Sequence, residues 1–192
     1  MAEDEELTPG NSGSVAPAES GTSSLILTTG TDDDIEFTER FVDERAPEDL
    51  LLLAGYSERA GAIDRFADIT LDGRKRLLTA GQDRAELTTD DALIETLADP
   101  HDLSTVGIKI SSFLDDDGGT VVCLYSLTAL LETVGVERLL RFLQILTNRI
   151  ATADAVGQFY LDRSEHDDQT IYMLRSVFDD VVETGSIARF SY

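Results

Sequence analysis

A continuous apolar stretch that follows a double glycine constrains the fold of this chain more than any other feature. Gly118-Gly119 is a turn signal, and the run from Thr120 to Leu124 behind it holds four consecutive apolar residues. A short polar step and a second apolar run, from Leu127 to Leu131, come next. Such a run between turn signals is typical of a strand buried on both faces, at the centre of a parallel sheet. We therefore expect an α/β protein organised around this strand.

The rest of the chain alternates between apolar strand-like runs and helical patterns. Strands are predicted at residues 24–29, 50–54, 76–80 and 155–161, and helices at residues 32–45, from 57 to about 66, 102–114, 136–153 and 167–178. Residues 92–97 fit either a short strand or a helical turn. Residues 181–182 and 187–192 are predicted as closing strands, which would fit an antiparallel hairpin on the sheet edge. Alternating strands and helices favour a mainly parallel sheet covered by helices on both faces.

The charge of the chain is extreme and spread along its whole length. Acidic residues number 38 against 15 basic ones, which gives a formal charge of -23. Residues 1–22 have almost nothing apolar to bury and are predicted to be a disordered acidic tail, which leaves residues 23–192 as one folded domain. A domain this charged repels itself unless salt screens it. With only two lysines and no tryptophan, the composition resembles that of a salt-accumulating archaeon, and an acidic mesophilic protein is the alternative.

The same charge excludes several partners. It opposes contact with nucleic-acid phosphates and with anionic lipid. No apolar run approaches the roughly 20 residues that span a bilayer, and the first residues do not form a signal peptide. We therefore expect a cytoplasmic protein that binds neither nucleic acid nor membrane. The single cysteine, Cys123, lies in the apolar run and is expected to be a buried structural thiol.

The elements that would bind a nucleotide are missing from the sequence. A phosphate-binding loop needs several glycines, a lysine and a Ser/Thr. Here the first predicted strand leads into residues 29–34, Thr-Gly-Thr-Asp-Asp-Asp. One carboxylate about 5 Å from a phosphate charge costs on the order of 3 kcal/mol at an effective dielectric of about 20. A helix N-terminus contributes only about 1 kcal/mol. We therefore expect no cofactor in this place.

The strand at 120–124 lacks the second nucleotide-site element. In nucleotide-hydrolysing α/β proteins, such a strand usually ends in an aspartate that helps hold magnesium. Tyr125 occupies that position here, and Glu132 lies too far into the next segment to replace the aspartate. A nucleotide-hydrolysing activity is therefore not expected, and no residue is assigned a catalytic, cofactor-binding or metal-binding role.

One other segment gathers chemically versatile side chains. Residues 162–168, Asp-Arg-Ser-Glu-His-Asp-Asp, follow a predicted strand, and α/β proteins place ligands at that end of a strand. The functional interpretation is a metal or acid–base site. The plainer one is a solvated loop with a helix cap, since acidic loops occur throughout the chain. Ser126, His166 and Asp162 could supply a nucleophilic triad, but no nucleophile-elbow glycines flank Ser126.

Three arginines mark the long predicted helix at 136–153. Arg138, Arg141 and Arg149 form a row along it. The row fits a partner-docking stripe, and it also fits an ordinary solvated face with nearby glutamates as partners.

The run from Val121 to Leu130, Val-Val-Cys-Leu-Tyr-Ser-Leu-Thr-Ala-Leu, resembles the strand motif of RecA/KaiC-like ATPases, in which apolar residues precede Asp-Ser-Leu-Thr. Residues 138–161 and 166–170 are similar to a haloarchaeal group of degenerate KaiC-type domains. The resemblance covers residues 120–184 well, and the first strand and helix only by their order. It implies a RecA-like (P-loop-type) core with the first strand next to the 120–124 strand. ATPase activity carries over to no residue here, because both nucleotide motifs depart from the pattern.

These observations predict a non-catalytic RecA/KaiC-like domain that binds protein, in a regulatory or signalling role in a haloarchaeon. Its partner would be an active ATPase relative or another copy of the chain. Two alternatives remain open at this point. One is a small-molecule or metal-dependent enzyme that uses residues 162–168, and the other is a structural self-assembling protein.

Overall fold

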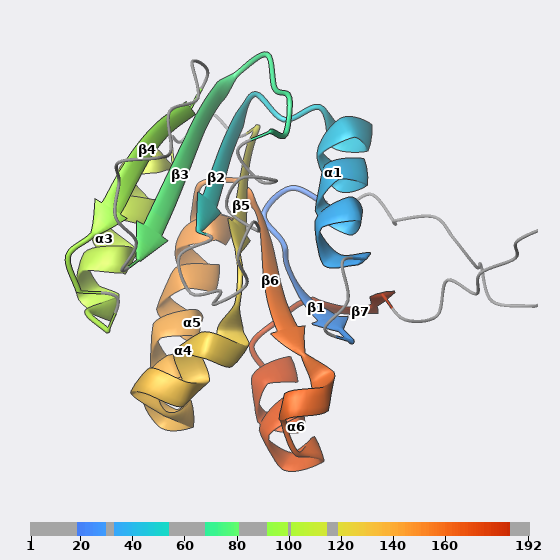
Figure 1. The fold of residues 1–192 in the computed structure, drawn as a ribbon, viewed down its shortest axis with the longest axis vertical. Helices are drawn as coiled ribbons and strands as arrows, with labels where there is room; N and C mark the ends of the chain where they lie inside the picture. The colour runs from blue at the N-terminus through green and yellow to red at the C-terminus, as the bar shows by residue number, and fades with distance from the viewer. Residues whose placement is uncertain are drawn as a thin grey trace, which may run out of the picture.

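The computed structural model describes residues 19–29, 33–53, 68–80, 92–99, 101–114 and 119–184 (Figure 1). The strands are β1 (Ser23–Thr28), β2 (Asp49–Leu53), β3 (Arg74–Ala80), β4 (Ala92–Leu97), β5 (Thr120–Leu124), β6 (Val156–Asp162) and β7 (Asp180–Glu183). The helices are α1 (Asp33–Arg45), α3 (Leu103–Phe113), α4 (Leu127–Val134), α5 (Val136–Thr152) and α6 (Asp168–Arg175), with a 3-10 turn at Arg163–Glu165. The helix predicted from residue 57 lies outside the described residues.

All seven strands belong to one parallel sheet with the order β4-β3-β2-β5-β6-β1-β7. The strand at 120–124 lies in the middle of it, between β2 and β6, and every one of its residues is buried. Residues 92–97, which the sequence left between strand and helical turn, form the edge strand β4. The predicted mainly parallel α/β sheet is therefore confirmed.

One expectation about strand neighbours is wrong. The first strand is not next to β5, because β6 lies between them and pairs with both. The side chains of β6 are buried from Val156 to Leu161, so this strand needs a neighbour on each side and takes an interior place. The predicted closing strand at 181–182 is confirmed as β7, which pairs parallel with β1, and its hairpin with residues 187–192 stays a prediction. The crossover through α6 returns the chain to the starting edge of the sheet, which gives a parallel strand. Residues 187–192 lie outside the described part.

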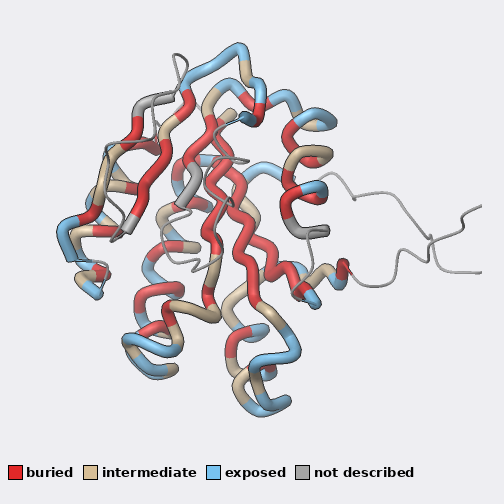
Figure 2. Tube along the Cα trace, viewed as in Figure 1, coloured by how far each residue is buried: buried red, intermediate tan, exposed pale blue. Residues whose placement is uncertain are grey.

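Helices cover both faces of the sheet, as predicted (Figure 1). On one face, α1 packs its Ile35, Phe37, Phe41 and Val42 against one core cluster. On the other face, α3, α4, α5 and α6 pack against a larger cluster. Figure 2 shows the buried stretch that runs through the central strands. Within the described residues, no helix is long and apolar enough to cross a membrane.

The long helix α5 follows directly from its sequence. Its buried residues repeat at helical spacing, and they are Leu139, Phe142, Leu143, Leu146 and Ile150. Glu137 lies in its first turn and Arg149 in its last, where each charge suits the helix dipole. The sequence pattern did not predict the preceding helix α4 as an element distinct from β5. It begins after Ser126, whose Oγ accepts a hydrogen bond from the Ala129 N–H at 3.4 Å.

The described chain begins before β1. Gly21 N donates to Ala155 O at 2.8 Å, and Gly157 N donates to Thr22 O at 2.9 Å. Residues 19–22 therefore belong to the hydrogen-bonded domain, while residues 1–18 of the predicted tail lie outside the described part.

Candidate functional site

The first candidate site is the carboxyl end of β5, where nucleotide-hydrolysing α/β proteins usually hold magnesium. Tyr125 follows β5 directly and is only 6% exposed. Its ring packs against the ring of Tyr160 on β6, with centroids 5.6 Å apart and planes tilted by 56°. Both residues belong to the core cluster beneath α1. The position is therefore filled by a buried aromatic pair.

A chain of buried polar groups continues from this pair toward α1. The Tyr160 hydroxyl donates to Gln158 Oε1 at 2.8 Å, so it is free to accept from the Thr38 hydroxyl, 2.6 Å away. The Cys123 thiol also points to Gln158 Oε1, at 3.8 Å. Burial raises the pKa of the Cys123 thiol to about 12, which keeps it protonated and unreactive at neutral pH. The predicted buried location of Cys123 is confirmed.

Removing the hydroxyl at the centre of this network should destabilise the fold. We expect Tyr160→Phe to lower the free energy of unfolding by about 1–3 kcal/mol, because Thr38 and Gln158 would each lose a partner inside the core. Urea denaturation would measure it. The matched control is Tyr172→Phe on the exposed face of α6, which should change the stability by less than about 0.5 kcal/mol. Equal effects of the two variants would show that the network contributes nothing.

The segment after β6 is built from helix caps. Asp162 Oδ1 accepts from the backbone N–H and the hydroxyl of Ser164, at 2.9 and 2.6 Å. Asp167 caps α6 by accepting from the Thr170 N–H at 2.7 Å. This backbone hydrogen bond holds the pKa of Asp167 below its usual range, so the residue is an ionised cap. The loop-and-cap interpretation of residues 162–168 is confirmed for both aspartates.

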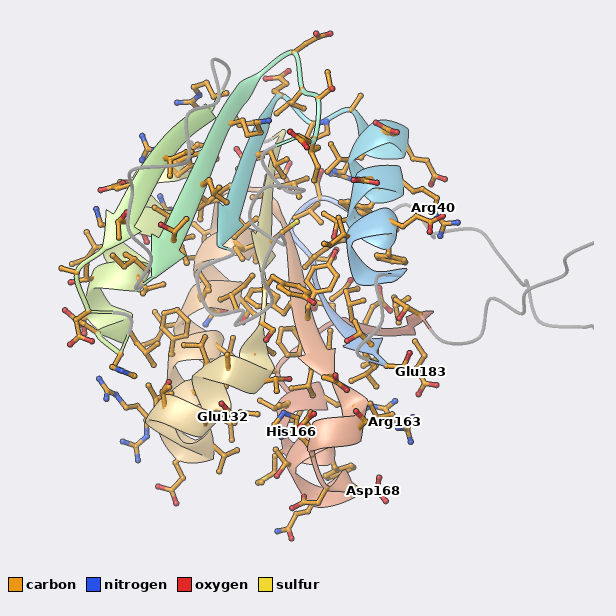
Figure 3. The ribbon with its side chains drawn as sticks, in the orientation of Figure 1. Arg40, Glu132, Arg163, His166, Asp168 and Glu183 are labelled. Atoms are coloured by element: carbon orange, nitrogen blue, oxygen red, sulfur yellow. The ribbon has the colours of Figure 1, made fainter. Side chains whose placement is uncertain are left out.

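Two residues of the hypothetical triad, His166 and Asp162, are both hydrogen-bonded to Thr128 of α4. His166 Nε2 lies 3.2 Å from Thr128 Oγ1, which also accepts from the Asp162 N–H at 2.9 Å. The Ser126 hydroxyl oxygen is used as the cap of α4. Figure 3 shows His166 and Asp168 at this end of the molecule, with Glu132 exposed on α4. Within the described residues, no three His, Cys, Asp or Glu side chains are grouped closely enough to hold a metal ion.

The aspartates that follow β1 can be placed only in part. The helix α1 begins at Asp33, five residues after the end of β1, so Asp33 and Asp34 belong to its first turn. Residues 30–32 and the side chains of Asp33 and Asp34 lie outside the described part.

The second place is an apolar groove between α3 and α5, with a volume of about 480 Å³. Leu103, Phe142 and Leu146 contribute buried apolar surface to it. Ile108 and Ile145 also line it and are 69% and 72% exposed. The sequence pattern counted both isoleucines among the apolar positions of their helices, but the structure places them at the surface. A groove with two large exposed aliphatic side chains is typical of a surface that binds another molecule.

The two helices that line the groove are net basic on a net acidic chain, and the Asp102 carboxylate at the N-cap of α3 lies near Arg138. The two helices carry four basic side chains and one acidic one, whereas the whole chain carries 15 and 38. Arg138 and Arg149 line the groove itself, and Arg138 donates to His101 O at 3.2 Å. Lys109 of α3 is paired with Glu95 of β4. Two of the three arginines noted in the sequence, Arg138 and Arg149, thus line an apolar groove, which favours the docking interpretation for these two over a plain solvated face.

Sequence reasoning found the arginines and missed the groove. The groove depends on α3 lying beside α5, and these helices are separated by β5 and α4 in the chain. Gly107 of α3 faces the ring of Phe142, where an added Cβ would lie 3.6 Å from Cε2, at van der Waals contact. The available signal was the position of Ile108 and Ile145 on otherwise polar helix faces.

Comparisons with known proteins agree on the fold. Solved structures similar to this chain include a protein from Pyrococcus horikoshii OT3, at 12% identity and a TM-score of 0.57, over 87% of this chain and 83% of that one. They also include the flagellar accessory protein FlaH from Methanocaldococcus jannaschii, at 14% identity and a TM-score of 0.52, over 86% of this chain and 71% of that one. No curated protein sequence matches the chain. At these identities the likeness shows the fold alone, which is the RecA-like α/β fold.

One family model covers almost the whole described domain. It matches residues 21–184, from just before β1 to just after β7. The chain therefore belongs to the family of unknown function DUF7504, and its fold is RecA-like.

Proposed function

We propose that this chain is a non-catalytic RecA-like domain that works by binding protein. The observation that carries the proposal is the apolar groove between α3 and α5, bordered by arginines on an otherwise acidic chain. Interfaces are rich in aromatic residues and arginine around an apolar centre. An exposed pair of isoleucines costs solubility, and a partner that covers them offsets this cost. The groove therefore supports a docking role better than a purely structural one.

We also propose that the domain does not catalyse nucleotide hydrolysis. Its support is the buried pair of Tyr125 and Tyr160, which occupies the end of β5 with apolar and neutral groups. A magnesium-bound triphosphate needs carboxylate, lysine and backbone donors at this edge of the sheet. A tyrosine that is 6% exposed supplies none of these to a ligand. The domain thus retains the fold of an ATPase relative without this part of its chemistry.

Isothermal titration with ATP and magnesium at high salt tests whether the domain binds a nucleotide. We expect no measurable heat of binding up to millimolar ATP, because β5 ends in a buried phenol instead of a metal-binding carboxylate. The titration is repeated on Tyr125→Phe and on a variant in which Asp32, Asp33 and Asp34 are replaced by asparagine. Saturable binding by the natural chain that either variant abolishes would overturn the proposal.

We further propose an ancestry, a source, a cellular location and partners for this chain. The match of residues 121–130 to the RecA/KaiC-like strand motif supports a degenerate KaiC-type ancestry. The charge of -23 with only two lysines supports a salt-accumulating archaeal source and a cytoplasmic location. An active ATPase relative and a second copy of this chain are the two partners that this ancestry suggests. The negative charge argues against nucleic acid and anionic membrane as partners.

A further inference from the structure

A third exposed hydrophobic residue lies outside the groove. Among the described residues, three large hydrophobic side chains are exposed, and Ile108 and Ile145 line the groove. The third is Tyr172 on α6, which is 77% exposed. The helices α5 and α6 belong to the same layer (Figure 1), yet Tyr172 stays exposed to solvent within a single chain. Its ring therefore does not fill the groove of its own molecule.

The surroundings of Tyr172 are acidic where those of the groove are basic. Asp168 lies one helical turn before Tyr172 on the same face, and Glu165 and Asp167 precede it, all of them exposed. The cations in this region are Arg163, which is paired with Glu183 at 2.7 Å, and Arg175 at the end of α6. The segment from Asp162 to Arg175 carries four carboxylates against two arginines and is net negative.

We propose that the groove between α3 and α5 binds α6 of a second copy of this chain, with Tyr172 inserted between Ile108 and Ile145. The inference rests on the proposed docking function and names its partner. Asp168 of one copy would then face Arg138 or Arg149 of the other. Tyrosine and arginine are the side chains that most often dominate binding energy at interfaces. An aromatic ring buries about 150–250 Å² of surface, which suits an apolar groove of this size.

Charge favours association of the basic groove with the acidic segment around Tyr172 over other contacts between two copies. Two copies with a charge of -23 each repel one another over most approaches. The helices that border the groove are net positive, so an acidic surface meets attraction there. Because the long-range repulsion involves far more charges than the local contact, added salt should strengthen the association. If two copies each bind the other's Tyr172 in their grooves, they form a closed two-fold dimer. If each copy binds the Tyr172 of a different neighbour, the copies assemble head to tail.

Analytical ultracentrifugation of the full chain in 2 M KCl, across micromolar to millimolar concentrations, tests the inference. We expect a mass that rises with protein concentration. Tyr172→Ala and Ile145→Asp should each weaken the association at least tenfold, whereas Tyr172→Phe should keep it. Glu132→Gln on α4 is the control for a change of surface charge outside both patches. All three positions are exposed, and circular dichroism verifies that each variant folds.

Mixing the two defective variants gives the sharper result. Tyr172→Ala keeps an intact groove and Ile145→Asp keeps an intact tyrosine, so an equimolar mixture should form a 1:1 dimer that neither forms alone. A charge exchange, in which Arg138 and Arg149 become glutamate and Asp168 becomes arginine, should recover part of the association lost with Asp168→Arg. A natural chain that stays monomeric at millimolar concentration, or associates equally well as Tyr172→Ala, overturns this inference. The proposed function is decided separately, by the ATP titration.

Discussion

Raising the salt concentration from about 0.1 M to about 1 M is expected to raise the Tm of this protein by roughly 10 °C. The cause is the formal charge of -23 on a chain that folds into a single sheet with its helices. Folding brings these charges together, and the Debye length decides how strongly they repel. It falls from about 10 Å at 0.1 M to about 3 Å at 1 M.

The size of the effect follows from simple electrostatics. For a uniformly charged sphere of about 20 Å radius, the repulsion falls by roughly 10 kcal/mol between these salt concentrations. For the expanded unfolded chain it falls by only about 2 kcal/mol. Opposite charges that pair on the surface, such as Arg163 and Glu183, reduce the difference. About 3 kcal/mol of added stability, at 2–4 °C per kcal/mol, gives the expected shift.

Calorimetry or thermal circular dichroism in KCl measures this shift. Screening should act mostly below about 1 M, since the Debye length changes little beyond it. A general salting-out effect would instead grow steadily with concentration. The matched control is sucrose at equal osmolality, which leaves the charges unscreened. A Tm that is the same at 0.1 M and 1 M KCl would contradict the expectation and remove the main support for a salt-adapted source.

The sequence predicts the elements of this fold better than their arrangement. Apolar runs located six of the seven strands, because a strand that is buried on both faces must be apolar throughout. Residue type also accounts for the start of α3, where Asp102 accepts from the Ser104 and Thr105 N–H groups. Each of these features depends on residues within one turn or one strand. Local chemistry therefore fixed them.

The order of the strands was not predictable in the same way. Burial of β6 requires two neighbours but does not say which strands they are. The sheet places β1 and β5 on its two sides, and this depends on the crossovers that carry the chain over each face. The same applies to β7, whose two valines predicted a strand but not its direction. Pairing is decided by packing between segments far apart in the chain.

In the candidate sites, too, the sequence predicted the local features and missed those that depend on long-range packing. Tyr125 was found from the sequence, because its position is defined by the strand before it. The polar network of Thr38, Tyr160 and Gln158 was not, because it joins α1 to β6 across more than a hundred residues. Tyr172 shows the limit clearly. Helical spacing cannot tell an exposed tyrosine from a buried one until α6 has a place in the fold.

Replacing Tyr125 with aspartate, the residue that usually ends such a strand in nucleotide-hydrolysing α/β proteins, is expected to lower the free energy of unfolding by about 4 kcal/mol or more. Two losses combine. Truncating a buried aromatic ring leaves a cavity next to Tyr160, and cavities of this kind cost about 3–5 kcal/mol. The new carboxylate would also be removed from water beside the Tyr160 ring, within a cluster of buried and mostly apolar residues. Denaturant unfolding at high salt measures the sum.

Two matched variants separate these losses. Tyr125→Phe keeps the ring and should cost no more than about 1.5 kcal/mol. Tyr125→Asn removes the ring without adding a charge. Burial raises the pKa of the introduced aspartate above its unfolded value near 3.9, so the charge penalty is absent below that pH and grows as the pH rises above it. The aspartate and asparagine variants should therefore be closest in stability near pH 4 and diverge toward pH 7. A stable Tyr125→Asp variant that binds magnesium and ATP would show that the nucleotide site is intact apart from this one residue, and the domain would have to be regarded as a dormant ATPase.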